Sequence, residues 1–239
     1  MTLNWQPHFW QTWQFKLLLA ALAGLILFGL DRLRVARIRE VERVRLRIAA
    51  DLHDEVGSNL GSVSMITRLL RKSKTMTPEE QRDVALIEQV TAQTANAVKD
   101  IVWFTNPGFD TMQDMLMRMK DTAETMLTSM ECEFKTDIES IDAKLPLEFR
   151  KNVFLIFKET LANVIKHSQA TRVDIGVSER QGLWQLRIHD NGMGFDPEKL
   201  SRGNGLKNLR RRAEQIGGTL EVQSKPGQGT TVRLSVKVS

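Results

Sequence analysis

Residues 186–195 read Leu-Arg-Ile-His-Asp-Asn-Gly-Met-Gly-Phe, an alternating run that ends in a glycine-bearing turn. Its first and third residues are apolar and its second and fourth are polar, which predicts a half-buried strand. The strand delivers Asp190 to a turn in which Gly192 and Gly194 let the backbone approach a ligand closely. Adenine recognition needs an acid aimed at an amino group, and this stretch could supply one. By itself, a glycine-bearing turn is more often purely structural, so the interpretation depends on the order and spacing of the motifs that surround it.

The residues before this strand predict a helix over 147–168 that carries a polar line on one face. Glu159 and Asn163 are four residues apart, and Lys166 and His167 follow one turn later. Residues at this spacing project from the same face of a helix. Such a line of polar groups suits a metal ion and phosphates.

Two further glycine-bearing segments follow the strand. Gly203-Asn-Gly205-Leu206 opens another helix. Glycines before a helix N-terminus favour phosphate binding, because backbone N–H groups and the helix dipole both point at the anion. Residues 220–238 then close as a hairpin through Pro226-Gly-Gln-Gly229.

The centre of the chain predicts two amphipathic helices. Apolar residues recur at three- and four-residue steps from Ile38 to Leu70, which predicts one long helix. Thr77-Pro78-Glu79-Glu80 is typical of a capped helix start, and Asn106-Pro107-Gly108 ends the second helix. Two such helices make a hairpin, and a dimer of hairpins makes a four-helix bundle.

His53 lies one position beyond Leu52, about 100° around the predicted helix, at the solvent-accessible edge of the apolar stripe. An exposed neutral imidazole can attack phosphorus, and the adjacent Asp54 can orient the ring and take its proton. By itself, a surface histidine beside acids is more often a solvated side chain. The nucleotide motifs favour the catalytic interpretation.

The N-terminal region predicts a membrane anchor. Residues 17–30 are an uninterrupted run of apolar residues and glycines, and counting from about Trp10 gives roughly 20 residues, enough to span a bilayer. Arg32, Arg34, Arg37 and Arg39 follow, as the positive-inside rule requires of a cytoplasmic flank. The alternatives are a buried core helix or a signal peptide, although the segment lacks a basic start and a small-residue cleavage site.

Charge and cysteine content argue against a nucleic-acid-binding protein and against a fold held by disulfides. The chain has 34 Lys and Arg residues against 29 Asp and Glu residues, a formal net charge of +5. The excess lies at Lys16 and within residues 31–50, so the remainder offers no broad basic face and direct nucleic-acid binding is not expected. Cys132 is the only cysteine, which excludes an intramolecular disulfide and fits a reducing compartment.

The motifs together resemble the catalytic domain that sensor histidine kinases share with the gyrase, Hsp90 and MutL ATPases. Glu159–His167 is similar to the N box, Asp190–Gly194 to the G1 box and Gly203–Leu206 to the G2 box. The resemblance covers roughly residues 40–239 and implies ATP and Mg²⁺ as cofactors. The ATP-binding residues that it implies are Glu159, Asn163, Lys166, His167, Asp190, Gly192, Gly194, Gly203, Gly205, Leu206 and Thr230.

The same resemblance implies roles within the site. Asn163 would help to bind Mg²⁺ with Glu159 nearby, and Asp190 would receive the adenine amino group. Residues 196–206 would form a lid over the phosphates.

Within that group, Asp51-Leu-His53-Asp54-Glu-Val-Gly57 is similar to the phosphoacceptor helix of the NarX/DesK-like kinases, where an acid directly follows the histidine. The resemblance implies that His53 is the phosphoacceptor and Asp54 the base. Many relatives place a glutamine five residues after the histidine, where it is associated with dephosphorylation of the regulator, but this chain has Ser58 there. Kinase activity is therefore better supported than phosphatase activity.

The implied fold is α+β: a transmembrane helix, a dimeric helical hairpin forming a four-helix bundle, and an α/β-sandwich ATP-binding domain with helices on one side of a mixed sheet. We divide the chain into an extracytoplasmic flank (1–14), a transmembrane helix (15–31), a dimerisation and histidine phosphotransfer domain (32–107) and a catalytic ATP-binding domain (108–239). The methionine-rich run from Met112 to Met126 is interpreted as packing between the last two domains.

The expected protein is a homodimeric sensor histidine kinase of the bacterial cytoplasmic membrane, with its N-terminus outside and its catalytic part in the cytoplasm. It would autophosphorylate His53 from ATP and pass the phosphoryl group to an aspartate of a response regulator with a helix-turn-helix output domain. Pro7–Trp13 resembles the junction after the extracellular domain of propeller-bearing sensors, so the chain is either part of a longer sensor or a truncated one.

Two other functions remain open. One is an ATPase or protein serine kinase of the same superfamily, which would have no use for an acid-flanked histidine on a dimerising helix. The other is a catalytically silent membrane scaffold that binds nucleotide and pairs with another kinase.

Overall fold

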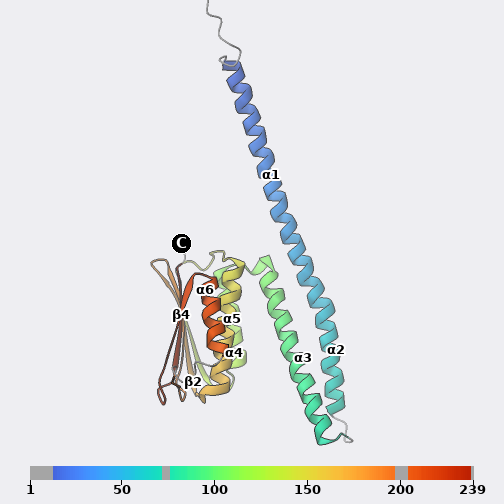
Figure 1. Cartoon of the computed structure of the whole chain (residues 1–239), viewed down its shortest axis with the longest axis vertical. Helices are drawn as coiled ribbons and strands as arrows, with labels where there is room; N and C mark the ends of the chain where they lie inside the picture. Colours follow the sequence, from blue (N-terminus) through green and yellow to red (C-terminus); the bar gives the residue numbers. More distant parts are fainter. Residues whose placement is uncertain (1–12, 72–75, 197–203, 238–239) are drawn as a thin grey trace, which may run out of the picture. The chain divides into compact units, whose positions relative to one another are not determined.

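The computed structural model describes residues 13–71, 76–196 and 204–237, without the side chains at positions 14, 42, 45, 53, 54 and 204. The chain divides into two compact units, Met1–Val102 and Trp103–Ser239. Figure 1 shows a helical first unit and a second unit that combines a sheet with helices. This order confirms the predicted helical hairpin followed by an α/β domain.

The first unit is built from long helices. They are α1 (Trp13–Asp51), the π-helix η2 (Leu52–Val56), α2 (Gly57–Arg71) and α3 (Pro78–Thr105), whose last three residues belong to the second unit. α2 and α3 are joined by ion pairs from Arg71 Nη1 and Arg68 Nε to the Glu88 carboxylate, at 3.0 and 3.6 Å.

The start of α3 has the predicted capping box. The backbone N–H of Glu80 donates to Thr77 Oγ1 at 3.3 Å, and the backbone N–H of Thr77 donates to Glu80 Oε2 at 2.7 Å. Each side chain therefore satisfies a backbone donor that the first helical turn leaves without an intrahelical partner. The backbone N–H and the hydroxyl of Thr77 both donate to Glu80 Oε2, at 2.7 and 2.9 Å, and thereby lower the pKa of the Glu80 carboxyl.

The predicted long helix is not uniformly α-helical. Its regular repeat is interrupted by η2, which contains His53 and Asp54. A π-helix closes i→i+5 hydrogen bonds and is wider than an α-helix, so the spacing of 100° per residue does not hold across this segment. The 100° step therefore does not apply at His53, and its place at the accessible edge of the apolar stripe stays a prediction.

The predicted transmembrane helix at residues 15–31 is not found. Within residues 13–71, 76–196 and 204–237, no helix is long and apolar enough to cross a membrane. The predicted span was counted from about Trp10, and residues 1–12 lie outside the described part of the chain.

The second unit contains a five-stranded mixed sheet with the strand order β1-β2-β3-β5-β4. β1 pairs with β2 in parallel, and the remaining neighbours are antiparallel. The strands are β1 (Glu131–Asp137), β2 (Arg172–Arg180), β3 (Leu183–Asp190), β4 (Gly218–Ser224) and β5 (Thr230–Lys237). Figure 1 shows the helices of this unit on one face of the sheet, which confirms the predicted two-layer arrangement.

The helices of the second unit are α4 (Met112–Met126), α5 (Leu147–Asn163) and α6 (Asn204–Gln215), with a 3₁₀ turn η3 (Pro107–Phe109) before α4 and a π-helix η4 (Val164–Ser168) after α5. Their apolar faces form one core with the alternate residues of the strands. Fully buried members of this core include Val153, Ile156, Phe157, Val173, Trp184 and Leu186.

The methionine-rich run lies elsewhere than predicted. Met112, Met115 and Met119 are buried in the core of the second unit, where α4 packs against α5. The helix is held by a capping box between Thr111 and Asp114, with the N–H of Asp114 donating to Thr111 Oγ1 at 3.1 Å. These methionines therefore stabilise the second unit internally.

Candidate functional site

The site is a cavity of about 440 Å³ between the sheet and the helices of the second unit. α5 and η4 supply one wall, the start of α6 a second, and strands β3, β4 and β5 the floor. Most of the lining is apolar, with a few polar groups, which is the usual make-up of a small-molecule site. The lining residues are Thr160, Asn163, Val164, His167, Ser168, Ile188, Asp190, Met193, Gly194, Phe195, Gly205, Leu206, Leu209, Val222, Thr230 and Val232.

Asp190 is the buried acid of this cavity. It is the last residue of β3 and only 3% exposed, and its Oδ1 accepts the backbone N–H of Gly192 at 2.9 Å. Burial raises the pKa of the carboxyl above its ordinary value of 3.8, although the N–H groups of Gly192 and Thr230 and the nearby His189 act in the opposite direction. A buried carboxylate with spare acceptor capacity can receive a hydrogen bond from a ligand amino group.

Two glycines next to Asp190 are required by close backbone packing. A Cβ on Gly192 would lie 2.3 Å from the carbonyl O of Ser168, and one on Gly229 would lie 2.0 Å from the carbonyl O of Asp190. Gly229 also has φ of +73°, in the region that favours glycine. The acid is therefore enclosed by backbone that only glycines allow to approach so closely.

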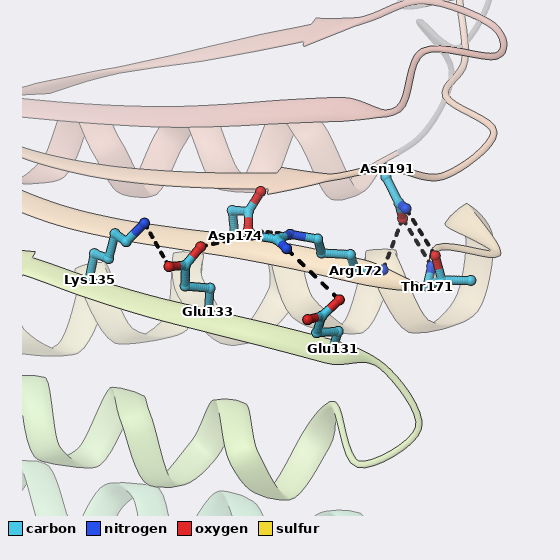
Figure 2. Close-up of polar contacts among 7 residues, drawn as sticks. All are labelled: Glu131, Glu133, Lys135, Thr171, Arg172, Asp174 and Asn191. Carbon is cyan, nitrogen blue, oxygen red and sulfur yellow. Dashed lines mark hydrogen bonds and ion pairs between the residues drawn. The ribbon is translucent and has the colours of Figure 1, made fainter.

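The Asp190 turn is joined to the start of β2 by Asn191, as Figure 2 shows. Asn191 Oδ1 accepts the backbone N–H groups of Thr171 and Arg172, both at 2.9 Å, and Asn191 Nδ2 donates to Thr171 Oγ1 at 2.9 Å. Three hydrogen bonds from one side chain orient this turn. We infer that Asn191 positions Asp190 and does not itself line the cavity.

A π-helical turn brings the end of α5 to the same loop. In η4, Ser168 Oγ donates to the carbonyl O of Val164 at 2.7 Å, and Gln169 follows in the left-handed conformation with φ of 54°. The carbonyl O of Ser168 then accepts the N–H of Met193 at 2.7 Å. The helix end and the Asp190 loop are thus held as one wall of the cavity.

A serine hydroxyl joins the other side of this loop to the β4–β5 hairpin. Ser224 Oγ accepts the backbone N–H of Phe195 at 2.9 Å, donates to the carbonyl O of Gly229 at 3.1 Å and lies 2.9 Å from Thr230 Oγ1. Gly227 N–H also donates to the carbonyl O of Met193 at 2.6 Å. The hairpin therefore positions both Phe195 and Thr230 at the cavity.

The structure brings most, but not all, of the predicted ATP-binding residues to this cavity. Those that line it are Asn163, His167, Asp190, Gly194, Gly205, Leu206 and Thr230. Lys166 is exposed, and neither it nor Glu159 is among the lining residues. Gly192 does not line the cavity but packs closely against Ser168 and Asp190. Gly203 and most of the predicted lid lie outside the described residues.

Glu159 and Asn163 were predicted to hold a metal ion. Asn163 lines the cavity, and Glu159 Oε1 lies 3.9 Å from the position that a Cβ on Gly205 would take at the cavity wall. Among the described residues, no group of three or more His, Cys, Asp or Glu side chains is arranged to hold a metal. The oxygens present suit an ion that takes most of its ligands from phosphates and water.

His53 and Asp54 belong to the other unit. Their backbone forms part of η2, and their side chains lie outside the described atoms. Their predicted roles as phosphoacceptor and base therefore stay predictions.

Several lining residues were not predicted from the sequence. Thr160, Val164 and Ser168 lie on the same helical segment as Asn163, and their spacing at three- and four-residue steps was the signal that could have identified them. Met193 and Phe195 flank Gly194 of the Asp190–Gly194 motif, and that position was the signal for them. Leu209 and Val222 gave no such signal, because their place at the cavity depends on contacts between segments distant in sequence.

Comparison with known proteins finds two family matches along the chain. Residues 44–109 match the family described as histidine kinase, and residues 150–239 match the family described as histidine kinase-, DNA gyrase B-, and HSP90-like ATPase. The first match contains η2, and the second contains every residue that lines the cavity.

The similar proteins include two staphylococcal sensors. The chain is 29% identical over 213 residues to the sensor protein VraS of Staphylococcus haemolyticus, and 28% identical to VraS of Staphylococcus aureus. Each alignment covers 89% of this chain and 60% of the relative. The chain therefore spans less than two thirds of the length of these relatives.

Among solved structures, the blue-light activated histidine kinase EL346 of Erythrobacter litoralis has a similar fold. The TM-score is 0.53 at 17% sequence identity, and the match covers 81% of this chain and 59% of that one. At this identity the likeness concerns the fold.

Proposed function

Because this chain belongs to the NarX/DesK-like sensor histidine kinases, we propose that it binds ATP in the cavity of the second unit and phosphorylates His53. The observation that carries the proposal is the buried Asp190 carboxylate at the wall of an apolar, glycine-bounded cavity. The phosphoryl group would then pass to an aspartate of a response regulator.

Adenine recognition would depend on Asp190 and the apolar floor. The carboxylate accepts the exocyclic amino group, while Ile188, Leu209 and Val222 contact the flat faces and edges of the ring. The pocket volume of about 440 Å³ is adequate for a nucleoside. Specificity for adenine follows because a carbonyl at the same ring position would repel the carboxylate.

The phosphates would lie toward the start of α6. Gly205 and Leu206 line the cavity in the first turn of this helix, where backbone N–H groups and the helix dipole favour an anion. His167 and Thr230 add side-chain donors at the cavity wall. Lys166 is exposed and does not line the cavity, so it is not assigned a contact with the phosphates.

Mg²⁺ would be held by Asn163 with Glu159 nearby, both of which carry oxygen ligands at the end of α5. The ion would neutralise charge on the phosphate oxygens. The residues of the chain would orient the nucleotide and exclude water from it.

In the transfer step, an imidazole nitrogen of His53 forms a bond to the γ-phosphorus, and the bond to the β–γ bridging oxygen breaks, so ADP leaves. Asp54 orients the ring and takes its proton. We assign phosphotransfer and dimerisation to residues 32–107 and ATP binding to residues 108–239. The π-helix η2 supports this assignment, since π-helical turns are frequent at functional sites.

The proposal extends to partners and location. The unit formed by the helices would act as a homodimer, and its regulator would carry a helix-turn-helix output domain. Attachment to the bacterial cytoplasmic membrane is supported by the exposed leucines of residues 17–30 and the arginines that follow them. Phosphatase activity toward the regulator is not part of the proposal, because Ser58 stands where many relatives have glutamine.

The test is autophosphorylation of the full chain with γ-labelled ATP and Mg²⁺. We expect label that is stable in base and lost in acid, as for phosphohistidine, and we expect it to disappear in His53→Gln and Asn163→Ala. His8→Gln is the matched control, because it removes a histidine that lies outside both family matches. Full labelling of His53→Gln would contradict the acceptor assignment, and absence of label despite nucleotide binding would favour the silent scaffold.

A further inference from the structure

The face of the sheet opposite the helices carries a row of cationic side chains. In the strand register, Lys135 on β1 pairs with Gly176 on β2, Gly176 with Arg187 on β3, and Arg187 with Arg233 on β5. The row ends on β4 at an acid, Glu221, which pairs with Arg233. Side chains alternate between the two faces of a sheet, so the residues just before and after each member of the row point to the opposite face. On β2, β3 and β5 these neighbouring residues are buried beneath the helices. The row therefore lies on the sheet face away from the nucleotide cavity.

Gly176 forms the bottom of a hollow in this row. Its φ is not positive, and a Cβ built on it would meet nothing within 4 Å, so neither a turn nor tight packing requires a glycine. Glycine in a strand interior weakens the strand and often marks a close approach by a ligand. The hollow measures about 560 Å³ and is lined by Lys135, Thr136, Asp137, Gly176, Val177, Ser178, Gln185, Arg187 and Arg233.

Arg187 is the least compensated charge in the hollow. Within the described part of the chain it is exposed and makes no ion pair or side-chain hydrogen bond, and its cross-strand neighbour is the like-charged Arg233. Like charges directly opposite each other destabilise an antiparallel pair. Among the residues that the structure describes, the ion pair given for Arg233 is loose, with Nη1 at 3.8 Å from Glu221 Oε2. An anion placed between the two arginines would relieve this repulsion.

The acids near the hollow are already engaged by cations, one of which is Lys135 of the row itself. Lys135 is exposed, and an exposed ion pair contributes little, so Lys135 can still contact a carboxylate of a ligand. Asp137 lines it, but its Oδ2 accepts Arg180 Nη2 at 2.6 Å and Nε at 3.1 Å. Glu133 lies 2.6 Å from Lys135 Nζ and also accepts Arg172 Nη2 at 2.8 Å, within the acidic and basic network drawn in Figure 2. The hollow is therefore cationic on its β3 and β5 side.

We propose that this hollow is a docking site for an acidic peptide segment of a partner protein, whose carboxylates contact Arg187, Arg233 and Lys135. The inference is independent of the proposed kinase function, because it concerns the opposite face of the sheet. Nothing in the nucleotide cavity contributes a residue to it.

The dimensions favour an extended acidic segment over a single small anion. The row crosses four strands spaced about 4.8 Å apart, so its cations cover a longer distance than one phosphate can bridge. Side chains on one face of an extended peptide recur about every 6.7 Å, which allows successive carboxylates to reach different cations. β2, β3 and β5 each have strands on both sides, so their backbone cannot accept an added strand, and recognition depends on side-chain charge.

The test measures binding of a fluorescent (Glu-Gly)₄ peptide to the full chain, in non-ionic detergent and with a saturating non-hydrolysable ATP analogue to occupy the nucleotide cavity. We expect binding that weakens steeply as salt is raised, and none for (Gln-Gly)₄. Removal of one cation in Arg187→Gln should weaken binding about three- to fivefold. Lys237→Gln is the matched control, since Lys237 is an exposed cation on β5 outside the hollow, and it should change binding less than about twofold.

A second variant separates shape from charge. Gly176→Val fills the hollow with a residue that favours strands and whose Cβ would meet nothing within 4 Å, so the protein should remain folded and bind the peptide more weakly. Unchanged affinity for the ATP analogue would show that each variant is folded. Equal peptide binding by wild type, Arg187→Gln and Gly176→Val would overturn the proposal. So would binding of pyrophosphate at this site without binding of the peptide.

Discussion

At the scale of single residues, Asp190 connects stability to ligand binding. Its pKa is raised in the folded state by burial, so the folded chain retains this proton to a higher pH than the unfolded chain does. Stability from this group is therefore present below its unfolded pKa and is lost as pH rises through the folded pKa. At neutral pH the buried, charged carboxylate therefore lowers the free energy of unfolding. A ligand amino group that donates to the carboxylate would offset this loss.

Asp190→Asn tests this account. As pH rises from about 4 to 7, we expect the variant to become more stable relative to wild type, measured as the free energy of unfolding. The reason is that only the wild type gains a buried charge over this range. Nucleotide affinity should fall about tenfold or more, since the charged acceptor is lost. Urea unfolding at both pH values and calorimetric titration with ATP measure the two effects. A pH-independent difference would contradict the cause given for the pKa shift.

Gly229→Ala tests the close approach of the β4–β5 hairpin to Asp190. The added Cβ would lie 2.0 Å from the carbonyl O of Asp190, so we expect a loss of about 2 kcal/mol or more in unfolding free energy. Gly227→Ala is the matched control, because its φ of +78° is similar but nothing lies within 4 Å of its Cβ. Only the cost of the left-handed conformation, about 1 kcal/mol, should appear there. Equal losses in thermal unfolding would contradict the steric explanation.

At the scale of elements, Arg150 fixes the segment that follows α3. This buried side chain on α5 donates from Nη1 to the carbonyl O of Phe109, reaches that of Phe104 with Nη2 at 3.5 Å, and lies over the Trp103 ring at 5.9 Å. It thus connects the end of α3 and the turn η3 to the core of the second unit. The guanidinium satisfies backbone acceptors that burial removes from water.

Arg150→Met should therefore destabilise the second unit by about 2–4 kcal/mol, because the chain loses a charged donor and buried carbonyls lose a partner. The measurement is urea unfolding followed by tryptophan fluorescence, to which Trp103 and Trp184 contribute from this unit. Arg180→Met removes an exposed arginine from the same unit and should change stability by less than about 1 kcal/mol. If Arg150→Met lowers the free energy of unfolding no more than Arg180→Met does, Arg150 does not fix the end of α3 and the turn η3 to the second unit.

The elements that sequence patterns predicted are those with strong local signals. The strands around Ile175, Ile188 and Leu234 alternate clearly, and Thr77 with Glu80 marks a helix start, so these features were correct. β1 and α4 were not recognised as elements of the sheet unit. β1 is an edge strand with few apolar residues, and the methionines of α4 are compatible with several packing partners.

The π-helices, and the hydrogen bonds between segments distant in sequence, could not be predicted from the sequence for a different reason. In the sequence, apolar residues recur at three- and four-residue steps on both sides of η2 and up to η4, as they do in an α-helix, so the pattern does not reveal the π-helical turns. Asn191 and Ser224 act through partners about twenty to thirty residues away, which only the folded chain brings together. The motif glycines were informative because their requirement is local to the backbone.

At the scale of the whole molecule, the two units divide the proposed reaction between them. The second unit holds the nucleotide cavity, and the first carries His53 within η2. Family matches cover the two parts separately, at residues 44–109 and 150–239. The account therefore requires that a nucleotide bound in one unit modifies a residue of the other, from the same chain or from its dimer partner.

The most direct test of this claim is to locate the phosphate after incubation with ATP and Mg²⁺, by mass spectrometry of a tryptic digest kept at neutral or basic pH. Residues 48–68 form one tryptic peptide that contains His53 and four hydroxyl residues, Ser58, Ser62, Ser64 and Thr67. We predict phosphate on His53 of this peptide, and its absence in Asp190→Asn, which retains His53 but lacks the acid of the nucleotide cavity. Phosphate on a serine or threonine, or an unmodified His53 in a chain that binds ATP, would contradict it.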